Sequence, residues 1–167
     1  MQAGVDAFAR GARCTIIDFR GLKGFSGRQI AANLQSHWPQ LRTERISFPD
    51  IEQGEIYPEV LARALEVPDN RAKLAAAVKA VAADAEAVGM PAIFGIHEPD
   101  KVMADLQDRL TMPVFEIPTI PPSVPGIRLR ELFEQVFPQR GLTLIPQQKV
   151  LSADLQAEII QLDLKDS

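Results

Sequence analysis

Cysteine is nearly absent from this chain of 167 residues, and long apolar runs are missing. The single cysteine, Cys14, has no partner for an internal disulfide, which fits a reducing compartment. No apolar stretch approaches the roughly 20 residues that a membrane-spanning helix needs, and no signal-peptide pattern opens the chain. We therefore expect a soluble, cytoplasmic protein with no direct membrane insertion.

An excess of basic residues is also lacking. Lys and Arg number 18 against 22 Asp and Glu, for a net charge of −4. Because a phosphate backbone requires a basic surface, nucleic acid is excluded as the main partner. The chain also lacks the histidine and cysteine spacings of metal sites, so we predict no metal. Hydrophobic residues at 46% and charged residues at 24% are typical of a globular protein.

Strand-like and helix-like segments alternate along most of the chain. The strand-like runs are 14–19, 42–48, 91–96 and 113–117, and the helix-like runs are 28–38, 59–65, 69–88, 100–110 and 126–137. This alternation predicts an α/β fold, with a mostly parallel sheet, helices on both faces and right-handed crossovers.

The run that begins at Asp69 is the clearest helix. Its apolar stripe is Leu74, Val78, Val81, Ala85 and Val88. These residues recur at spacings of four and three, which is typical of an amphipathic helix, and Gly89 suits the position just beyond its end.

Two further strands, 142–150 and 157–164, are expected near the end of the chain, with a polar turn at Ser152 to Asp154. They lie close enough in sequence to pair as a hairpin. We therefore predict an α/β domain over residues 1–140 and a C-terminal β-hairpin appendage over residues 141–167.

A glycine-punctuated loop follows the first strand. The glycines of Gly21–Gly27 have the spacing G-x-x-G-x-x-G, which differs from the dinucleotide and P-loop fingerprints. Backbone N–H groups before a helix can still hold an anion, with Lys23, Ser26 and Arg28 beside it. The alternative is a flexible connection that uses glycine for its turns.

A proline-rich loop follows the 113–117 strand. Its four prolines are Pro118, Pro121, Pro122 and Pro125. Each fixes φ, so the loop is expected to be rigid and to position Thr119, Ser123, Gly126 and Arg128 for a substrate. The alternative is an inert linker.

His97 ends the 91–96 strand, at the sheet edge where both loops are expected. It is therefore a candidate general acid or base. An ordinary loop histidine is the alternative.

Residues 90–96 (MPAIFGI) and 113–129 (PVFEIPTIPPSVPGIRL) closely resemble the B subunit family of anaerobic glycerol-3-phosphate dehydrogenase. The order of elements agrees over nearly the whole chain. The resemblance implies a flavin, FAD or FMN, in the intact protein and oxidation of glycerol 3-phosphate linked to quinone. It also implies a catalytic subunit and an iron–sulfur subunit as partners, through which the protein would be peripheral at the inner membrane.

In the wider flavoprotein superfamily, flavin-binding stretches open and close the chain, and neither is present here. The resemblance therefore implies an interior, substrate-side segment that is not active alone, binds no cofactor by itself and continues into a flavin-binding domain beyond the hairpin. Two rivals stay open: a stand-alone module that binds small anions or acts in regulation, and an assembly domain that docks partner subunits.

Overall fold

The computed structural model describes residues 2–51, 54–156 and 159–166. The chain divides into two compact units, Met1–Leu129 and Arg130–Ser167, and each is described by itself.

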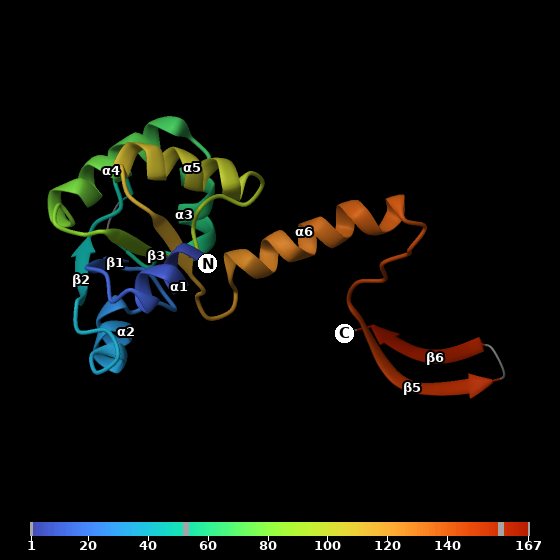
Figure 1. The fold of residues 1–167 in the computed structure, drawn as a ribbon. Coiled ribbons are helices and arrows are strands. Elements are labelled where there is room, and N and C mark those ends of the chain that lie inside the picture. Colours follow the sequence, from blue (N-terminus) through green and yellow to red (C-terminus); the bar gives the residue numbers. More distant parts are fainter. Residues whose placement is uncertain (1, 52–53, 157–158, 167) are drawn as a thin grey trace. The chain divides into compact units, whose positions relative to one another are not determined.

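The first unit is built on a four-stranded parallel sheet (Figure 1). Its strands are β1 (Cys14–Phe19), β2 (Leu41–Ile46), β3 (Ala87–Pro91) and β4 (Val114–Ile117). They lie in the order β2-β1-β3-β4, all parallel. The order changes direction between β1 and β3, and ligands of such sheets bind beyond the carboxyl ends of the strands at that point.

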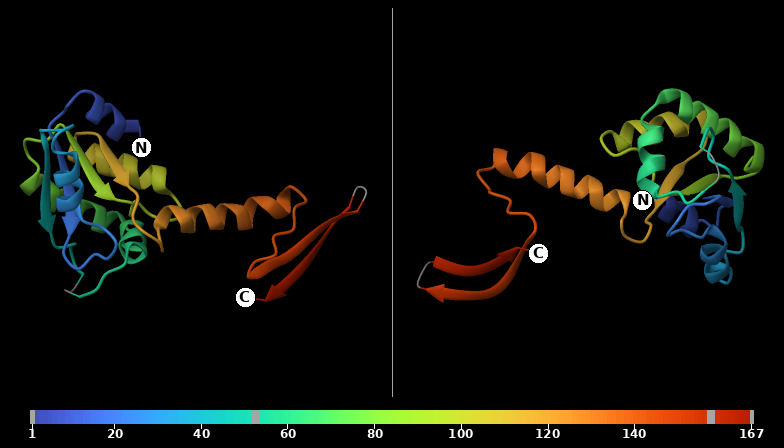
Figure 2. Two further views of the ribbon diagram at one scale, coloured as in Figure 1. Left: turned by 90° about the horizontal axis from the view of Figure 1, so that it is seen from below. Right: turned by 180° about the vertical axis from the view of Figure 1, so that it is seen from behind.

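Helices cover both faces of this sheet (Figures 1 and 2). On one face lie α1 (Gln2–Ala9) and α2 (Gly27–Leu34), and on the other lie α3 (Pro58–Leu65), α4 (Pro68–Val81) and α5 (Pro99–Leu110). The predicted α/β class is therefore confirmed. Helix α1 lies outside the segments for which the sequence predicted a helix.

Strand β1 lies at the centre of two hydrophobic clusters. Ile17 and Phe19 pack with α3, α4 and α5, whereas Cys14 and Ile16 pack with α1 and α2. Because successive side chains of a strand point to opposite faces, a strand buried on both faces is mostly apolar, and in β1 the buried polar exceptions are Thr15 and Asp18. Trp38 closes the second cluster, and its indole Nε1–H donates to the Ala12 carbonyl at 2.7 Å.

The helix predicted over 69–88 is wrong in its last third. Helix α4 ends at Val81, where the N–H of Ala82 donates to the Val78 carbonyl. Val88 and Gly89 belong to β3, and Gly89 has no side chain because the Phe115 ring lies 2.8 Å from the place of a Cβ. The apolar spacing of the helix simply continues into the strand, so the two could not be separated by periodicity.

The strand predicted over 91–96 is also displaced. Only Pro91 belongs to β3, and residues 92–96 form a buried loop beyond its carboxyl end. This loop is apolar because it is buried, and it places Phe94 to Ile96 at the edge of the sheet where ligands bind.

Helix α6 (Val124–Gln139) begins in the first unit and continues into the second, which also contains an antiparallel hairpin. Its strands are β5 (Gln148–Gln156) and β6 (Ile159–Asp166), so the predicted hairpin is confirmed. The predicted turn at Ser152 to Asp154 is wrong, because these residues pair with 161–163 inside the hairpin. The predicted strand over 142–150 begins only at Gln148, and Ala157 lies outside the described residues.

Among the helices described, none is both long enough and apolar enough to cross a bilayer.

Candidate functional site

The glycine loop and the proline loop meet at the carboxyl edge of the sheet. The N–H of Ile120, in the proline loop, lies 3.4 Å from the carbonyl oxygen of Gly24, to which it donates. Gly24 has φ of +74°, and a Cβ built on it would lie 2.6 Å from Ile120 Cγ1. Glycine suits this contact, because the backbone is left-handed and a Cβ here would overlap the Ile120 side chain unless that side chain moved.

Two buried oxygen atoms lie in this part of the first unit. Thr119 in the proline loop is buried, and within the described residues its hydroxyl has no hydrogen-bond partner. Asp18 on β1 is also buried; its Oδ2 accepts from the N–H of Gly27, and its Oδ1 has no partner among the described residues. A buried polar atom without a partner is uncommon and calls for an explanation such as a ligand or a water.

The three residues predicted to surround an anion in the glycine loop have separate surroundings. Ser26 is the N-cap of α2, and its Oγ accepts from the N–H of Gln29 at 3.3 Å. Lys23 forms an ion pair of 2.7 Å with Glu55, and this pair raises the pKa of the lysine. Arg28 is exposed in the first turn of α2.

A carboxylate already lies at the N-terminus of α2. Asp18 Oδ2 is 3.2 Å from the backbone nitrogen of Gly27. In dinucleotide folds this position, after the first strand, holds the cofactor pyrophosphate. Because a buried carboxylate would repel a pyrophosphate, the residues of this turn do not fit the dinucleotide of a flavin.

Arg128 and Glu116 tie together three segments of the same sheet edge. Nη1 and Nη2 of Arg128 donate to Oε2 and Oε1 of Glu116 at 2.6 and 2.8 Å. Nε and Nη2 of Arg128 also donate to the carbonyl of Gly95, at 2.9 and 2.7 Å. The N–H of Phe94 donates to Glu116 Oε1 at 2.6 Å. Arg128, which we expected to be positioned for a substrate, therefore holds Glu116 with its guanidinium group.

Ser123 and Gly126 interact with each other at the start of α6. The Ser123 hydroxyl accepts from the N–H of Gly126 at 3.4 Å, and the backbone carbonyl of Ser123 accepts from the N–H of Ile127 at 3.1 Å. Since α6 begins at Val124, Gly126 lies inside the first turn rather than before it. Thr119 is thus the predicted substrate residue whose buried polar group lacks a hydrogen-bond partner in the described part of the chain.

His97 lies beside Glu66 at the loop after β3. The backbone N–H groups of Ile96 and His97 both donate to Glu66 Oε1, at 2.9 and 3.0 Å. The His97 Nε2 is 4.0 Å from the same oxygen, and 55% of its side chain is exposed. Partial burial raises the pKa of Glu66, but the two backbone hydrogen bonds and the nearby charges of His97 and Arg63 leave that pKa lower than usual.

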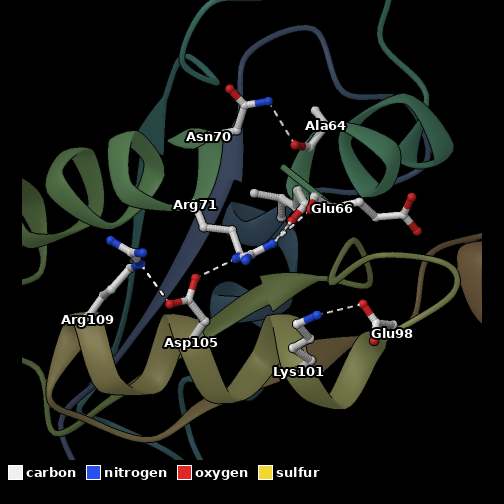
Figure 3. Close-up of polar contacts among 9 residues, drawn as sticks. Ala64, Glu66, Asn70, Arg71, Glu98, Lys101, Asp105 and Arg109 are labelled. Atoms are coloured by element: carbon white, nitrogen blue, oxygen red, sulfur yellow. Dashed lines mark hydrogen bonds and ion pairs between the residues drawn. The ribbon is translucent and has the colours of Figure 1, made fainter. Parts of the chain in front are cut away.

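A pocket of about 190 Å³ opens beside this histidine. It is lined by Glu66, Pro68, Arg71, His97, Glu98, Lys101 and Val102. Figure 3 shows that several of its charged side chains come from the α3–α4 turn, from α4 and from the start of α5.

The buried Arg71 organises the wall of this pocket. Its Nη1 donates to the carbonyls of Leu65 and Glu66 at 2.8 and 3.1 Å, and its Nε donates to Asp105. Arg109 also donates to Asp105, at 3.0 Å (Figure 3). Burial raises the pKa of Asp105, and the bonds from Arg109 and Arg71 overcome this effect and hold it below its usual value. The network joins α3, α4 and α5, so its first role is structural.

Glu116, Glu66 and Asp18 were missed by the sequence analysis. Each is a carboxylate in or beside an apolar segment, and that placement is the only signal that could have found them. No group of three or more potential metal ligands occurs among the described residues.

Comparison with known proteins gives related chains, whereas no solved structure matches this chain. The chain is 31% identical over 150 residues to the B subunit of anaerobic glycerol-3-phosphate dehydrogenase of Pectobacterium atrosepticum. This alignment covers 87% of this chain and 36% of the relative. It is 32% identical over 155 residues to the probable B subunit of the same enzyme of Halobacterium salinarum, covering 85% of this chain and 36% of the relative. The chain thus spans about a third of the length of these relatives.

A family model described as an FAD binding domain matches residues 5–160. This range includes the sheet, the two loops at its carboxyl edge and most of the hairpin. Since the match extends over nearly the whole sequence, the chain belongs to the FAD binding domain family.

Proposed function

We propose that this chain is the interior, substrate-side part of a flavin-dependent oxidoreductase similar to the B subunit of anaerobic glycerol-3-phosphate dehydrogenase. Its relatives carry that name, and they are nearly three times as long as the part that aligns here. In this proposal FAD is held by polypeptide outside these 167 residues, and the segment is not active alone.

The observation that carries the proposal is the junction of Gly24 with Ile120 beside the buried Thr119. It brings a glycine loop and a rigid proline loop together at the carboxyl edge of a parallel sheet, which is where ligands of such folds bind. The flavin supplies electron transfer, so the role of this segment is to bind and orient a small phosphorylated substrate. Glycerol 3-phosphate is the first candidate, because the relatives are named for it.

Thr119 and Arg128 have different roles in this proposal. The Thr119 hydroxyl donates to the substrate or accepts from it, which gives the buried oxygen the partner that it lacks among the described residues. Arg128 acts through Glu116 and Gly95, and holds the proline loop in place. His97 is the candidate for proton transfer in this proposal, because it lies in the loop after β3 at the same edge of the sheet.

The partners that follow are the catalytic and iron–sulfur subunits of such a dehydrogenase. The protein would then work on the cytoplasmic side of the inner membrane, attached through those subunits.

The first experiment is to purify the protein as its gene encodes it and to record its absorption spectrum. We expect the protein to contain a bound flavin. In the presence of the partner subunits and without oxygen, glycerol 3-phosphate should bleach the absorption of this flavin. A protein without flavin that binds phosphate metabolites in calorimetry would instead favour the stand-alone anion-binding module.

Thr119 gives a sharper test in the same preparation. Replacement of Thr119 by Val keeps the shape and removes the hydroxyl, whereas Thr119→Ser keeps the hydroxyl. If the hydroxyl bonds the substrate, Thr119→Val should weaken substrate use by roughly 5- to 150-fold, because a hydrogen bond lost in a buried site costs about 1–3 kcal/mol. Thr119→Ser should stay close to the original. Equal activity of both variants would remove Thr119 from the substrate site.

A further inference from the structure

The β5–β6 hairpin has two chemically different faces. Directly opposite residues of an antiparallel pair share a face. On one face the pairs are Val150–Leu164, Ala153–Leu162 and Leu155–Ile160, which we call the apolar face. On the other face the pairs are Lys149–Lys165, Ser152–Asp163 and Asp154–Gln161, which we call the polar face, although Ile159 at the start of β6 also lies on it.

An irregularity in β5 keeps the apolar face continuous. Val150 pairs with Leu164 and Ser152 with Asp163, so Leu151 is the extra residue of a β-bulge. Such a bulge sets two residues against one and shifts the alternation by one position. Without it, Ala153 and Leu155 would turn to the face opposite Val150. The bulge therefore aligns the apolar residues of both halves of β5.

The apolar face is exposed, although its composition is that of a core. The exposed fraction is 52% for Val150, 77% for Leu155, 65% for Ile160 and 48% for Leu162. Of the side chains described between Arg130 and Lys165, none is buried. A two-stranded hairpin is only marginally stable in water and needs a layer against its apolar side. A covering layer must therefore exist.

The length of the relatives indicates where that layer comes from. The family match runs to residue 160 and so includes the hairpin up to Ile160, while the chain spans only 36% of the relatives' length. We propose that the apolar face of β5–β6 packs against polypeptide outside these 167 residues, as one layer of the flavin-binding part of the intact flavoprotein. The charged groups Lys149, Lys165, Asp154 and Asp163 then remain on the solvent side. This inference rests on the proposed function for the identity of the covering polypeptide.

Two neighbouring residues of β6 give a matched test. Ile160 lies on the apolar face and Gln161 on the polar face, and both are exposed in this chain. In the protein as its gene encodes it, Ile160→Asp should speed amide exchange in β5 and β6 at least about tenfold, because it places a charge in an apolar layer. Gln161→Lys should not speed exchange, because the new charge lies on the polar face directly opposite Asp154.

Three results would overturn the proposal. The first is an equal effect of the two variants. The second is amide protection of the hairpin that is as strong in the 167-residue chain as in the whole protein, since the cover would then lie within residues 1–129. The third is protection that falls on dilution, since a second copy would then be the cover. Flavin content is measured in the same samples: a protein without flavin, but sensitive at Ile160 alone, would reject the proposed function and retain the docking surface.

Discussion

Glu116 and Arg128 form a two-pronged ion pair, 2.6 and 2.8 Å long, between the end of β4 and the first turns of α6. Their side chains are only 20% and 18% exposed. Because Arg128 also holds the Gly95 carbonyl, the pair fixes the proline loop and the loop after β3 at the same time.

Replacement of Arg128 by Ala should lower the free energy of unfolding by about 3–5 kcal/mol, because Glu116 is left as a mostly buried carboxylate without its partner. Urea unfolding of the chain measures this loss. Arg130→Ala is the matched control on the same helix, since its partner Glu134 lies at 2.7 Å in an exposed pair. The control should change the urea midpoint very little, because water screens exposed ion pairs. Similar losses of stability for the two variants would contradict a structural role for Arg128.

Replacement of Gly24 by Ala should destabilise the chain more than replacement of Gly11. Both glycines have positive φ, +74° and +60°, so alanine at either position costs about 1–2 kcal/mol. Gly11 has nothing within 4 Å of its missing Cβ, whereas Gly24 has Ile120 Cγ1 at 2.6 Å.

The difference between these two variants isolates the contact between the loops. Denaturant midpoints give the energies, and hydrogen exchange at Ile120 reports whether the proline loop has moved. Equal losses would mean that the loops do not depend on each other.

Strands β1, β2 and β4 and most helix starts could be predicted from the sequence, because burial on both faces makes β1 mostly apolar and prolines open α3, α4 and α5. The boundary at Val81 could not be predicted. Ala85 and Val88 continue the helical spacing by chance, and it is the pairing of Val88 with Thr15 on one side and Val114 on the other that makes its segment a strand.

The candidate site was predicted in its loops but not in its interactions. The prolines and glycines marked the two loops that meet at Gly24. The partner of Arg128 could not be found, because Glu116 is 12 residues away and nothing in the sequence joins them. Long-range ion pairs depend on the tertiary fold, whereas turn and cap residues depend on their immediate neighbours.

Glu66 should make the loop after β3 sensitive to acid. Its pKa is lowered in the folded state, so its contribution to stability is full above its unfolded pKa, about 4.3, and is lost as the pH falls through its folded value. Glu66→Gln should keep the acceptor for Ile96 and His97 but show a smaller loss of stability on acidification.

Urea midpoints at neutral and acidic pH measure this difference. Glu98→Gln is the control, since Glu98 pairs with Lys101 in an exposed ion pair that contributes little. An acid response of Glu66→Gln identical to that of the original chain would contradict this role for the carboxylate.

Cys14 should make the fold sensitive to alkali. Burial raises the pKa of its thiol from 9.0 to about 12, against a smaller lowering by a hydrogen bond with the Gly89 backbone. Above pH 9 the unfolded chain loses this proton while the folded chain keeps it, so stability falls with rising pH until about pH 12. The slope contributed by this group is roughly 1.4 kcal/mol per pH unit.

Replacement of Cys14 by Ala removes this slope and leaves that of every other titrating group, so the difference between the two unfolding curves isolates the thiol. The loss of packing in Cys14→Ala is a constant offset that does not change with pH. The same burial should protect the thiol from alkylation at neutral pH until urea unfolds the chain, since the thiolate is the reactive form. If alkylation were as fast in the folded chain as in urea, Cys14 would have to be accessible, and the packing of β1 against α1 and α2 would be wrong at this position.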